Sequence, residues 1–253
     1  MQDLDYSQHY EKWHPDTPEH ISGMKAFYQK ILIPHLPTDR NIKILDVGCG
    51  QGLALLSLQD IGYSDLVGID LNFVQVQVCL KRRLNVIQTE NSLEYLQKFP
   101  EAYHLILLLD VLEHIPYQEQ LAFLRAIYRT LKPGGQIICT VPNANSILAS
   151  RWRYIDWTHQ ISFTETSLDF LLYNAGFQQT KIHETEFFDP PNLRLFLSRS
   201  ILQHWFWKTL IHYLIFLWTR ANHRLTMIAE LGWEQGSQIP LSLNLLAIAQ
   251  KTP

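Results

Sequence analysis

The sequence predicts an α/β fold built on a doubly wound, mostly parallel sheet. Apolar, strand-like runs alternate with helix-like segments from residue 43 to residue 141, and this order is typical of parallel strands joined by right-handed helical crossovers. The run from Leu105 to Leu109 is apolar without alternation, as expected of a central strand that is buried on both faces. With 253 residues, the chain has room for one domain with elaborations.

The individual elements follow from hydrophobic periodicity and from helix-stop residues. The expected strands lie at residues 43–47, 65–69, 85–88, 103–109, 135–141 and 243–249, and the expected helices at 52–60, 73–83, 92–98, 117–131 and 165–174. An amphipathic pattern around Phe27 predicts a leading helix that ends near Pro34. We expect residues 1–40 to form this helix and a lid, in which Tyr6 and Tyr10 either cover a ligand or pack on the sheet edge.

The first strand ends in three glycines at alternate positions, Gly48, Gly50 and Gly52, with Asp46 just before them. Glycine permits positive φ angles and a close approach of a ligand to the backbone, and the following helix presents free N–H groups to that ligand. Asp70 ends the next strand, where a carboxylate can accept hydrogen bonds from both hydroxyls of a ribose. The spacing therefore predicts a nucleotide-type ligand at this edge of the sheet.

These residues resemble the first motif and the ribose-binding acid of the class I S-adenosylmethionine (SAM)-dependent methyltransferases. The resemblance implies a Rossmann-like sheet of seven strands, with the last strand antiparallel. It also implies a single domain over residues 1–253, with a SAM-binding core at 41–143 and the acceptor side at 144–253. The residues expected to bind SAM are Asp46, Gly48, Cys49, Gly50, Gly52, Asp70, Leu71, Asn91, Ser92 and Asp110.

Two of these assignments come from later motifs. Asn91 and Ser92 follow the third strand, where the family commonly carries an acidic and a small residue against adenine; the Asn91 oxygen can still accept from an exocyclic amine. The segment from Asp110 to Pro116 is similar to the family's fourth motif, whose loop lines the sulfonium and the acceptor. The helix stop and turn at residues 131–135 is also typical of the family.

Residues 156–164 resemble a subgroup found among enzymes of glycan and lipid-linked sugar biosynthesis. This resemblance implies O-methylation of a sugar or of a lipid-linked saccharide. The candidate general bases are His159, Asp156 and His114, because histidine is suited to proton transfer near neutral pH. Asp156 is spaced to hold the imidazole of His159 by one ring nitrogen, while the alternative for His159 is a structural role.

Two other functions are consistent with the sequence. The pair Glu113-His114 also resembles ubiquinone-pathway enzymes, which favours a lipid quinone or a small aromatic compound as acceptor. Some of those enzymes use a divalent metal there, but two adjacent residues are insufficient to coordinate one, so no metal is predicted. The non-enzymatic alternative is a SAM-fold subunit that binds a membrane or a protein partner.

Composition restricts the partners and the compartment. The formal net charge is −3 and the sequence pI is about 6.4, so no basic field attracts nucleic acid, which we do not expect as a partner. The three cysteines, Cys49, Cys79 and Cys139, lie in apolar patterns without metal-type spacing and suit reduced thiols. The N-terminus resembles no signal peptide, and we expect a cytoplasmic protein that acts on a small-molecule or lipid-linked acceptor.

Residues 190–240 are expected to form a helical insertion before the last strand. Within them, residues 193–218 combine many Trp and Phe residues with cationic ones. The longest uninterrupted apolar piece is shorter than the roughly 20 residues of a spanning helix. We therefore expect a helix that contacts the membrane peripherally or forms a homodimer interface.

Overall fold

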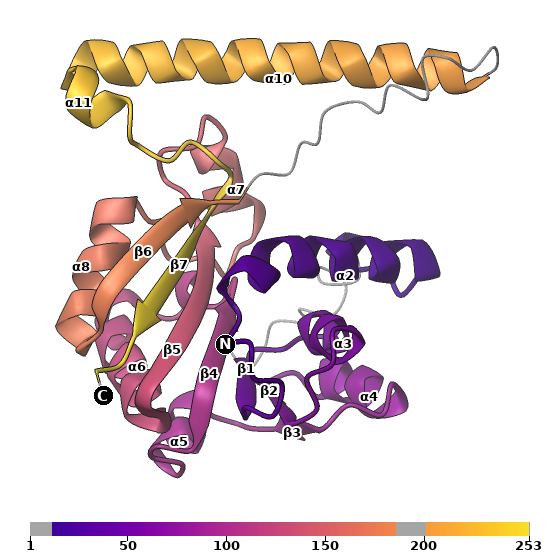
Figure 1. Ribbon diagram of the computed structural model, residues 1–253, viewed down its shortest axis with the longest axis vertical. Coiled ribbons are helices and arrows are strands. Elements are labelled where there is room, and N and C mark those ends of the chain that lie inside the picture. The colour runs from indigo at the N-terminus through magenta and orange to yellow at the C-terminus, as the bar shows by residue number, and fades with distance from the viewer. Residues whose placement is uncertain (1–11, 186–200, 253) are drawn as a thin grey trace.

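The computed structural model describes residues 12–185 and 201–252. A seven-stranded sheet has the order β3-β2-β1-β4-β5-β7-β6 and runs through the whole molecule (Figure 1). The first five strands pair in parallel, and β7 pairs antiparallel with both β5 and β6. The predicted sheet, mostly parallel with an antiparallel last strand, is confirmed.

The strands are β1 (Ile44–Val47), β2 (Leu66–Asp70), β3 (Val86–Gln88), β4 (Tyr103–Leu109), β5 (Leu131–Pro142), β6 (Gln178–Glu184) and β7 (Asn244–Gln250). The α-helices are α2 (Pro18–Leu32), α3 (Leu53–Asp60), α4 (Phe73–Lys81), α5 (Ser92–Gln97), α6 (Tyr117–Thr130), α7 (Ala149–Ile155), α8 (Glu165–Ala175), α10 (Ile201–Leu231) and α11 (Trp233–Gly236). Short 3-10 helices span Ile33–His35 and Leu112–His114.

The hydrophobic core is divided by the sheet into two layers. Helices α5, α6 and α8 pack on one face, where Phe123 and Leu168 belong to one buried cluster with side chains of β4, β5 and β7. Helices α2, α3 and α4 cover the other face, where Leu32 and Leu55 are buried against β1 and β2 (Figure 1). Burial on both faces explains why the central strands are uniformly apolar. The three cysteines are free thiols inside these layers.

The sequence pattern did not locate β6, the seventh strand. Its residues are mostly polar, and they alternate between exposed and half-buried positions at the sheet edge. A strand with one paired edge and little apolar surface leaves a weak period-two signal. Its pairing with β7, for example of Ile182 with Ala247, identifies it in the structure.

Helix α10 is the most unusual element of the fold. It has 31 residues and extends across the top of the molecule, away from the sheet (Figure 1). Helix α11 returns the chain to β7. No helix among the described residues is long and apolar enough to cross a membrane. Two predictions, for Tyr6 and Tyr10 and for residues 190–200, fall outside the described residues.

Candidate functional site

The three glycines after β1 form a left-handed turn that leads into α3. The φ angles are 71° at Gly48, 51° at Gly50 and 74° at Gly52, a region that other residues rarely adopt. A Cβ atom at Gly48 would lie 2.6 Å from a methyl group of Val111. Glycine is therefore required here by the backbone conformation and by packing against the loop after β4, as well as by any ligand.

Asp70 closes this turn from the end of β2. Its carboxylate accepts hydrogen bonds from the backbone N–H of Gly50 (2.8 Å) and of Asn72 (2.7 Å). Desolvation raises the pKa of Asp70, and these backbone donors oppose the shift. The side chain thus fixes the turn at the position where the resemblance expects a ribose.

Asp46 lies on β1 beneath the same turn and is only 2% exposed. Burial, together with the nearby Asp70 carboxylate, raises the pKa of Asp46 to about 7. Two carboxyl groups therefore share a site in which the protein supplies little compensating charge. Such a site favours a cationic ligand.

A cavity of about 510 Å³ connects the turn to the acceptor side, a volume typical of small-molecule sites. It brings together seven of the predicted site residues: Asp46, Gly48, Cys49, Asp110, His114, Asp156 and His159. The other predicted residues are not among those that line it: Gly50, Gly52, Asp70, Leu71, Asn91 and Ser92. Residues predicted to bind SAM and residues predicted to act on the acceptor thus line one cavity.

Leu71 and Asn91 lie at the surface near the cofactor turn. Leu71 is 57% exposed, which leaves an apolar side chain available to a bound planar group. Asn91 is the N-cap of α5: its side-chain oxygen accepts from the N–H groups of Leu93 (2.9 Å) and Glu94 (3.3 Å). Ser92 is the first residue of that helix. The capping role accounts for Asn91 without a ligand, and an adenine contact stays a prediction.

The N-terminal segment forms one wall of the cavity through Trp13, His14, Met24 and Tyr28. It is tied to the glycine turn, because the side-chain amide of Gln51 donates to the carbonyl of His14 (3.0 Å). Arg82 donates both to the carbonyl of Gln51 and to the carboxylate of Asp16. The Trp13 ring also lies 6.2 Å from that of Trp152, between centroids. The described part of this segment thus lines the cavity, and the lid expected at residues 1–40 stays a prediction.

Asp110 follows β4 in a left-handed conformation, with φ 55°, which is uncommon for a residue other than glycine. Its carboxylate accepts from the Thr140 hydroxyl (3.0 Å) and from the Asn244 amide (2.9 Å). The Asp110 side chain faces the cavity, whose walls shield it from bulk water. This desolvation raises the pKa of Asp110, and the hydrogen bond from the Thr140 hydroxyl opposes the shift. The loop after β4 is therefore held by side chains of β5 and β7.

A chain of hydrogen bonds orients the imidazole ring of His114. The Thr158 hydroxyl lies 2.7 Å from the buried carboxylate of Asp156 and 2.8 Å from Nδ1 of His114. An ionised carboxylate only accepts, so Thr158 donates to Asp156 and accepts from the ring N–H of His114. The proton of neutral His114 then lies on Nδ1, and Nε2 carries the lone pair.

His159 is oriented in the same way by a backbone group. Its Nδ1 lies 2.8 Å from the carbonyl oxygen of Trp152, which can only accept, so Nδ1 carries a proton, and in the neutral ring the lone pair lies on Nε2. His159 Nδ1 thus donates to a carbonyl oxygen of α7, whereas the sequence spacing suggested Asp156 as the acceptor. The rings of His114 and His159 pack edge to face with centroids 4.6 Å apart. Two basic nitrogens are therefore presented side by side in the cavity.

Glu113 adds a third potential ligand atom to these two histidines. One ligand atom each from Glu113, His114 and His159 lie within 4.8 Å of one another. Glu113 is 1% exposed, and its Oε2 has no hydrogen-bond partner among the described residues. Burial and the carboxylates of Asp110 and Asp156 raise its pKa. An orphaned carboxylate beside two imidazoles fits a divalent cation, which the adjacent pair in the sequence did not predict.

Sequence reasoning missed several of the wall residues. Trp152 lines the cavity, and its indole Nε1 is buried without a hydrogen-bond partner among the described residues, so it offers a donor to a ligand. Asn244 reaches the cavity from the start of β7. Neither residue lies in a recognisable motif. The cluster of aromatic residues at 152–157 was the sequence signal that pointed to Trp152, and no sequence signal pointed to Asn244.

Comparisons with known proteins agree with this geometry. A family model described as a methyltransferase domain matches residues 20–182. Ubiquinone biosynthesis O-methyltransferases from Aliivibrio fischeri and Yersinia pestis are 33% and 31% identical to this chain, each over 41% of it. The matched part spans 45% and 44% of those relatives, less than half of their length.

Two solved structures extend the similarity over nearly the whole chain. A SAM-dependent methyltransferase from Archaeoglobus fulgidus has a TM-score of 0.65 at 21% identity, covering 98% of this chain and 100% of that one. Phosphoethanolamine N-methyltransferase 2 of Haemonchus contortus, in complex with SAM, has a TM-score of 0.58 at 17% identity, covering 99% and 60%. At these identities the matches establish the shared fold.

Proposed function

Because this chain belongs to the class I SAM-dependent methyltransferases, we propose that it transfers the methyl group of SAM to a hydroxyl oxygen of an acceptor bound in the cavity. The observation that carries this proposal is the shared cavity. It joins the glycine turn and Asp46 at one end to His114 and His159 at the other. In the neutral form of each imidazole the lone pair lies on Nε2, and a hydroxyl acceptor needs such a base more than an amine acceptor does.

SAM supplies, when bound, a methyl group on a positively charged sulfur. The chain's own contribution is to align the acceptor, exclude water and remove one proton. Bound SAM would give its methyl group to the acceptor oxygen and leave as S-adenosylhomocysteine, and Nε2 of His159 or His114 would take the hydroxyl proton. The carboxylate of Asp156, acting through Thr158, stabilises the imidazolium that forms on His114.

The acceptor that we propose first is a sugar or a lipid-linked saccharide. The segment from Asp156 to Thr164, which resembles enzymes of that subgroup, supplies His159 and Asp156 to the cavity. Sugar hydroxyls have a high pKa, so their methylation requires a base. A paired set of basic nitrogens next to the cofactor turn meets that requirement.

A lipid quinone precursor or another small aromatic compound is the second candidate. Two observations favour it: the named function of the Aliivibrio fischeri relative and the cluster of Glu113, His114 and His159. These three residues would hold a divalent cation, which would supply Lewis-acid activation of an acceptor hydroxyl. Adjacent aromatic hydroxyls suit such an ion because hard cations prefer oxygen ligands.

An acceptor panel separates these candidates. SAM carrying a labelled methyl group is incubated with the protein and with either lipid-linked saccharides or a catechol-type quinone precursor, and the labelled product is identified by mass spectrometry. Transfer to one class assigns the acceptor. Tight SAM binding by calorimetry, with no product from either class, would instead favour a SAM-binding subunit without catalysis.

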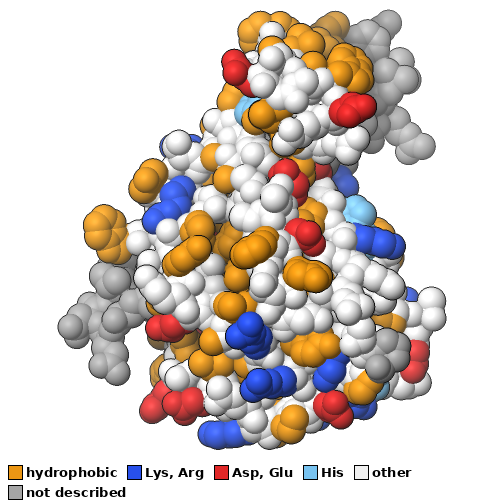
Figure 2. Space-filling view, turned by 90° about the vertical axis from the view of Figure 1, so that its left-hand side faces the viewer, with side chains coloured by type: hydrophobic (Ala, Val, Ile, Leu, Met, Phe, Trp, Pro, Cys, Tyr) orange, Lys and Arg blue, Asp and Glu red, His pale blue; other side chains and the backbone are white. Residues whose placement is uncertain are grey.

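We also propose that α10 mediates peripheral contact with a membrane, with a homodimer as the alternative. The helix exposes large apolar side chains along its length. Hydrophobic side chains are visible at the top of the molecule, where α10 lies, as well as on the face below it (Figure 2). On α10, Leu214 is 54% and Trp218 70% exposed. Liposome flotation beside light scattering tests this proposal. A stable dimer that ignores anionic liposomes would leave the interface alternative.

A further inference from the structure

A second cavity lies beneath α10, next to the main one. Its volume is about 180 Å³, below the 300–1,000 Å³ of a complete small-molecule site. Such a volume suits one appended group of a larger ligand. Five apolar side chains contribute to its walls: Ile147, Leu148, Phe216, Leu241 and Leu243.

The polar groups that also line this cavity are engaged within the protein. The Ser242 hydroxyl donates to the carbonyl of Asn244 (2.6 Å) and accepts from the N–H of Thr185 (3.2 Å). The Thr185 hydroxyl donates to the same Asn244 carbonyl, 2.9 Å away. The Ser146 hydroxyl accepts a hydrogen bond from the backbone N–H of Leu148. What these walls offer a ligand is therefore mainly apolar surface.

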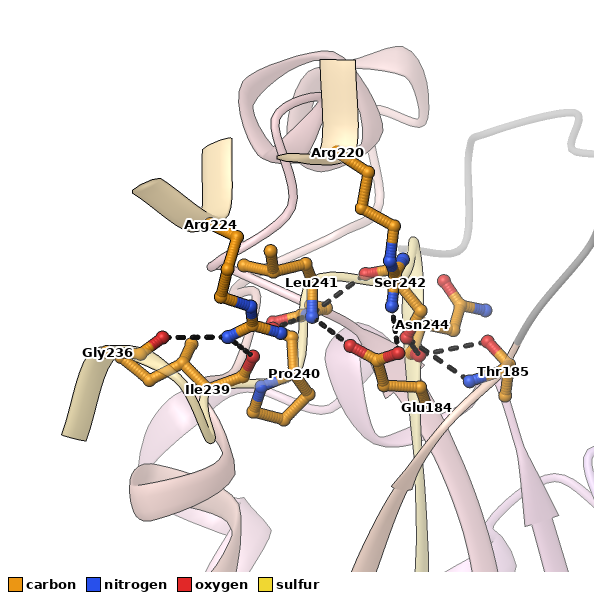
Figure 3. Close-up of polar contacts among 11 residues, drawn as sticks. Glu184, Thr185, Arg220, Arg224, Gly236, Ile239, Pro240, Leu241, Ser242 and Asn244 are labelled. Atoms are coloured by element: carbon orange, nitrogen blue, oxygen red, sulfur yellow. Dashed lines mark hydrogen bonds and ion pairs between the residues drawn. The ribbon is translucent and has the colours of Figure 1, made fainter. Parts of the chain in front are cut away.

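Two arginines hold α10 over the cavity as a fixed roof (Figure 3). Arg220 forms an ion pair with Glu184 at the end of β6, and this carboxylate also accepts from the N–H of Leu241. Arg224 donates to the carbonyls of Gly236 (2.8 Å) and Ile239 (2.6 Å). The cavity is thus bounded on both sides by elements that are cross-linked to each other.

His223 also faces this cavity from α10. Burial, with the charges of Arg224 and Arg220, lowers its pKa, so the imidazole is neutral at neutral pH. The charge of Arg220 is balanced by Glu184. The walls therefore present no uncompensated charge from these groups, which agrees with an uncharged occupant.

Leu243 lines both the main cavity and the second one, so the two cavities adjoin at this residue. We infer that the second cavity is a subsite for an apolar tail of the methyl acceptor, whose reactive hydroxyl lies in the main cavity. The inference rests on the proposed function and narrows it to amphiphilic acceptors. Ile147 and Leu148, 61% and 43% exposed, extend the apolar surface outward from the subsite for a longer tail.

The chain offers a matched pair of variants for the test. Thr219 and Thr226 both lie on α10, and each hydroxyl donates to a backbone carbonyl one turn earlier, at 2.8 Å and 3.1 Å. Only Thr219 lines the second cavity, whereas Thr226 is exposed. Thr219→Trp therefore fills the cavity from its roof, and Thr226→Trp adds the same bulk outside it.

Calorimetry with 4-hexylphenol and phenol, in the presence of S-adenosylhomocysteine, measures what the tail contributes. We expect the affinity gain of 4-hexylphenol over phenol to be at least tenfold smaller in Thr219→Trp than in Thr226→Trp. Ile147→Glu, at an exposed wall position that does not depend on core packing, should reduce the same gain. The inference is overturned if folded Thr219→Trp keeps the same affinity gain as the wild type and as the control Thr226→Trp.

A further comparison separates this inference from the proposed function. A normal affinity gain in Thr219→Trp, together with methylation of an acceptor by the wild type, would refute the subsite and leave methyl transfer standing. Conversely, if Thr219→Trp loses the affinity gain of 4-hexylphenol over phenol but the wild type methylates no acceptor, the subsite stands and the proposed methyl transfer is refuted. Binding of S-adenosylhomocysteine should be unchanged in all variants, because none of these residues lies at the cofactor turn.

Discussion

Replacing Asp46 by asparagine should change both the free energy of unfolding and the number of protons released when SAM binds. Asp46 is buried, and its pKa of about 7 in the fold compares with about 3.9 in an unfolded chain. This difference corresponds to roughly 4 kcal/mol of lost stability when the carboxyl is fully ionised. The asparagine side chain has the same shape and cannot ionise, so it avoids this cost.

The sign follows from the direction of the pKa shift. Because the folded-state pKa lies above the unfolded value, protonation of Asp46 favours folding. The penalty is absent below about pH 4, grows as the pH rises, and is constant above about pH 7. We therefore expect the free energy of unfolding of Asp46→Asn to exceed that of the wild type by up to roughly 4 kcal/mol at about pH 8, and by little at about pH 4.

Urea denaturation across this pH range measures the difference, with the exposed Asp169→Asn as a control for the loss of one charge. SAM binding gives a second measurement. A cationic ligand near Asp46 should ionise the carboxyl, so binding at about pH 6 should release close to one proton, and at about pH 8.5 almost none. Calorimetry in buffers of different ionisation enthalpy counts that proton. Equal pH profiles for wild type and Asp46→Asn, with no proton released, would refute the reasoning.

Three further predictions concern the rest of the cavity. Asp70→Ala should weaken SAM binding by about 1–3 kcal/mol in calorimetry, because a charged acceptor is lost and the turn at Gly50 loosens; unchanged affinity in a folded variant would contradict this. If His159 is the base, His159→Asn should lower turnover by roughly 10²–10⁴ at saturating acceptor with SAM affinity intact, and Asp156→Asn should cost less; equal turnover would return His159 to a structural role. Chelation with EDTA should lower turnover if Glu113 and its neighbours hold a cation, and added Mg²⁺ or Zn²⁺ should restore it; indifference to both would dismiss the ion.

Much of the fold was predictable because its central strands are buried on both faces. The apolar run that became β4 and the glycine turn after β1 each follow from local sequence. The edge strand β6 was not predictable from its polar residues, because its identity depends on pairing with β7, 60 and more residues later in the chain. Short-range patterns carry little information about such pairing.

In the site, too, features set by local sequence were predictable and features set by long-range contacts were not. The glycine turn and Asp70 are local and have recognisable spacing. The partner of His159 was less predictable, since Asp156 and the carbonyl of Trp152 are both near in sequence and only the fold selects the hydrogen bond to Nδ1. The cluster with Glu113 was hidden because it joins the loop after β4 to the segment after α7. Contacts across the cavity follow from tertiary structure alone.

The contact between Trp13 and Trp152 has a kinetic consequence. These rings come from two segments that line the cavity, one before α2 and one on α7, and they lie against each other. We expect SAM to enter, and its product to leave, when these two segments separate and the hydrogen bond between Gln51 and His14 opens. The turnover number would then be governed by how fast the N-terminal segment detaches, and mutations there would alter product residence time without touching the transferred methyl group.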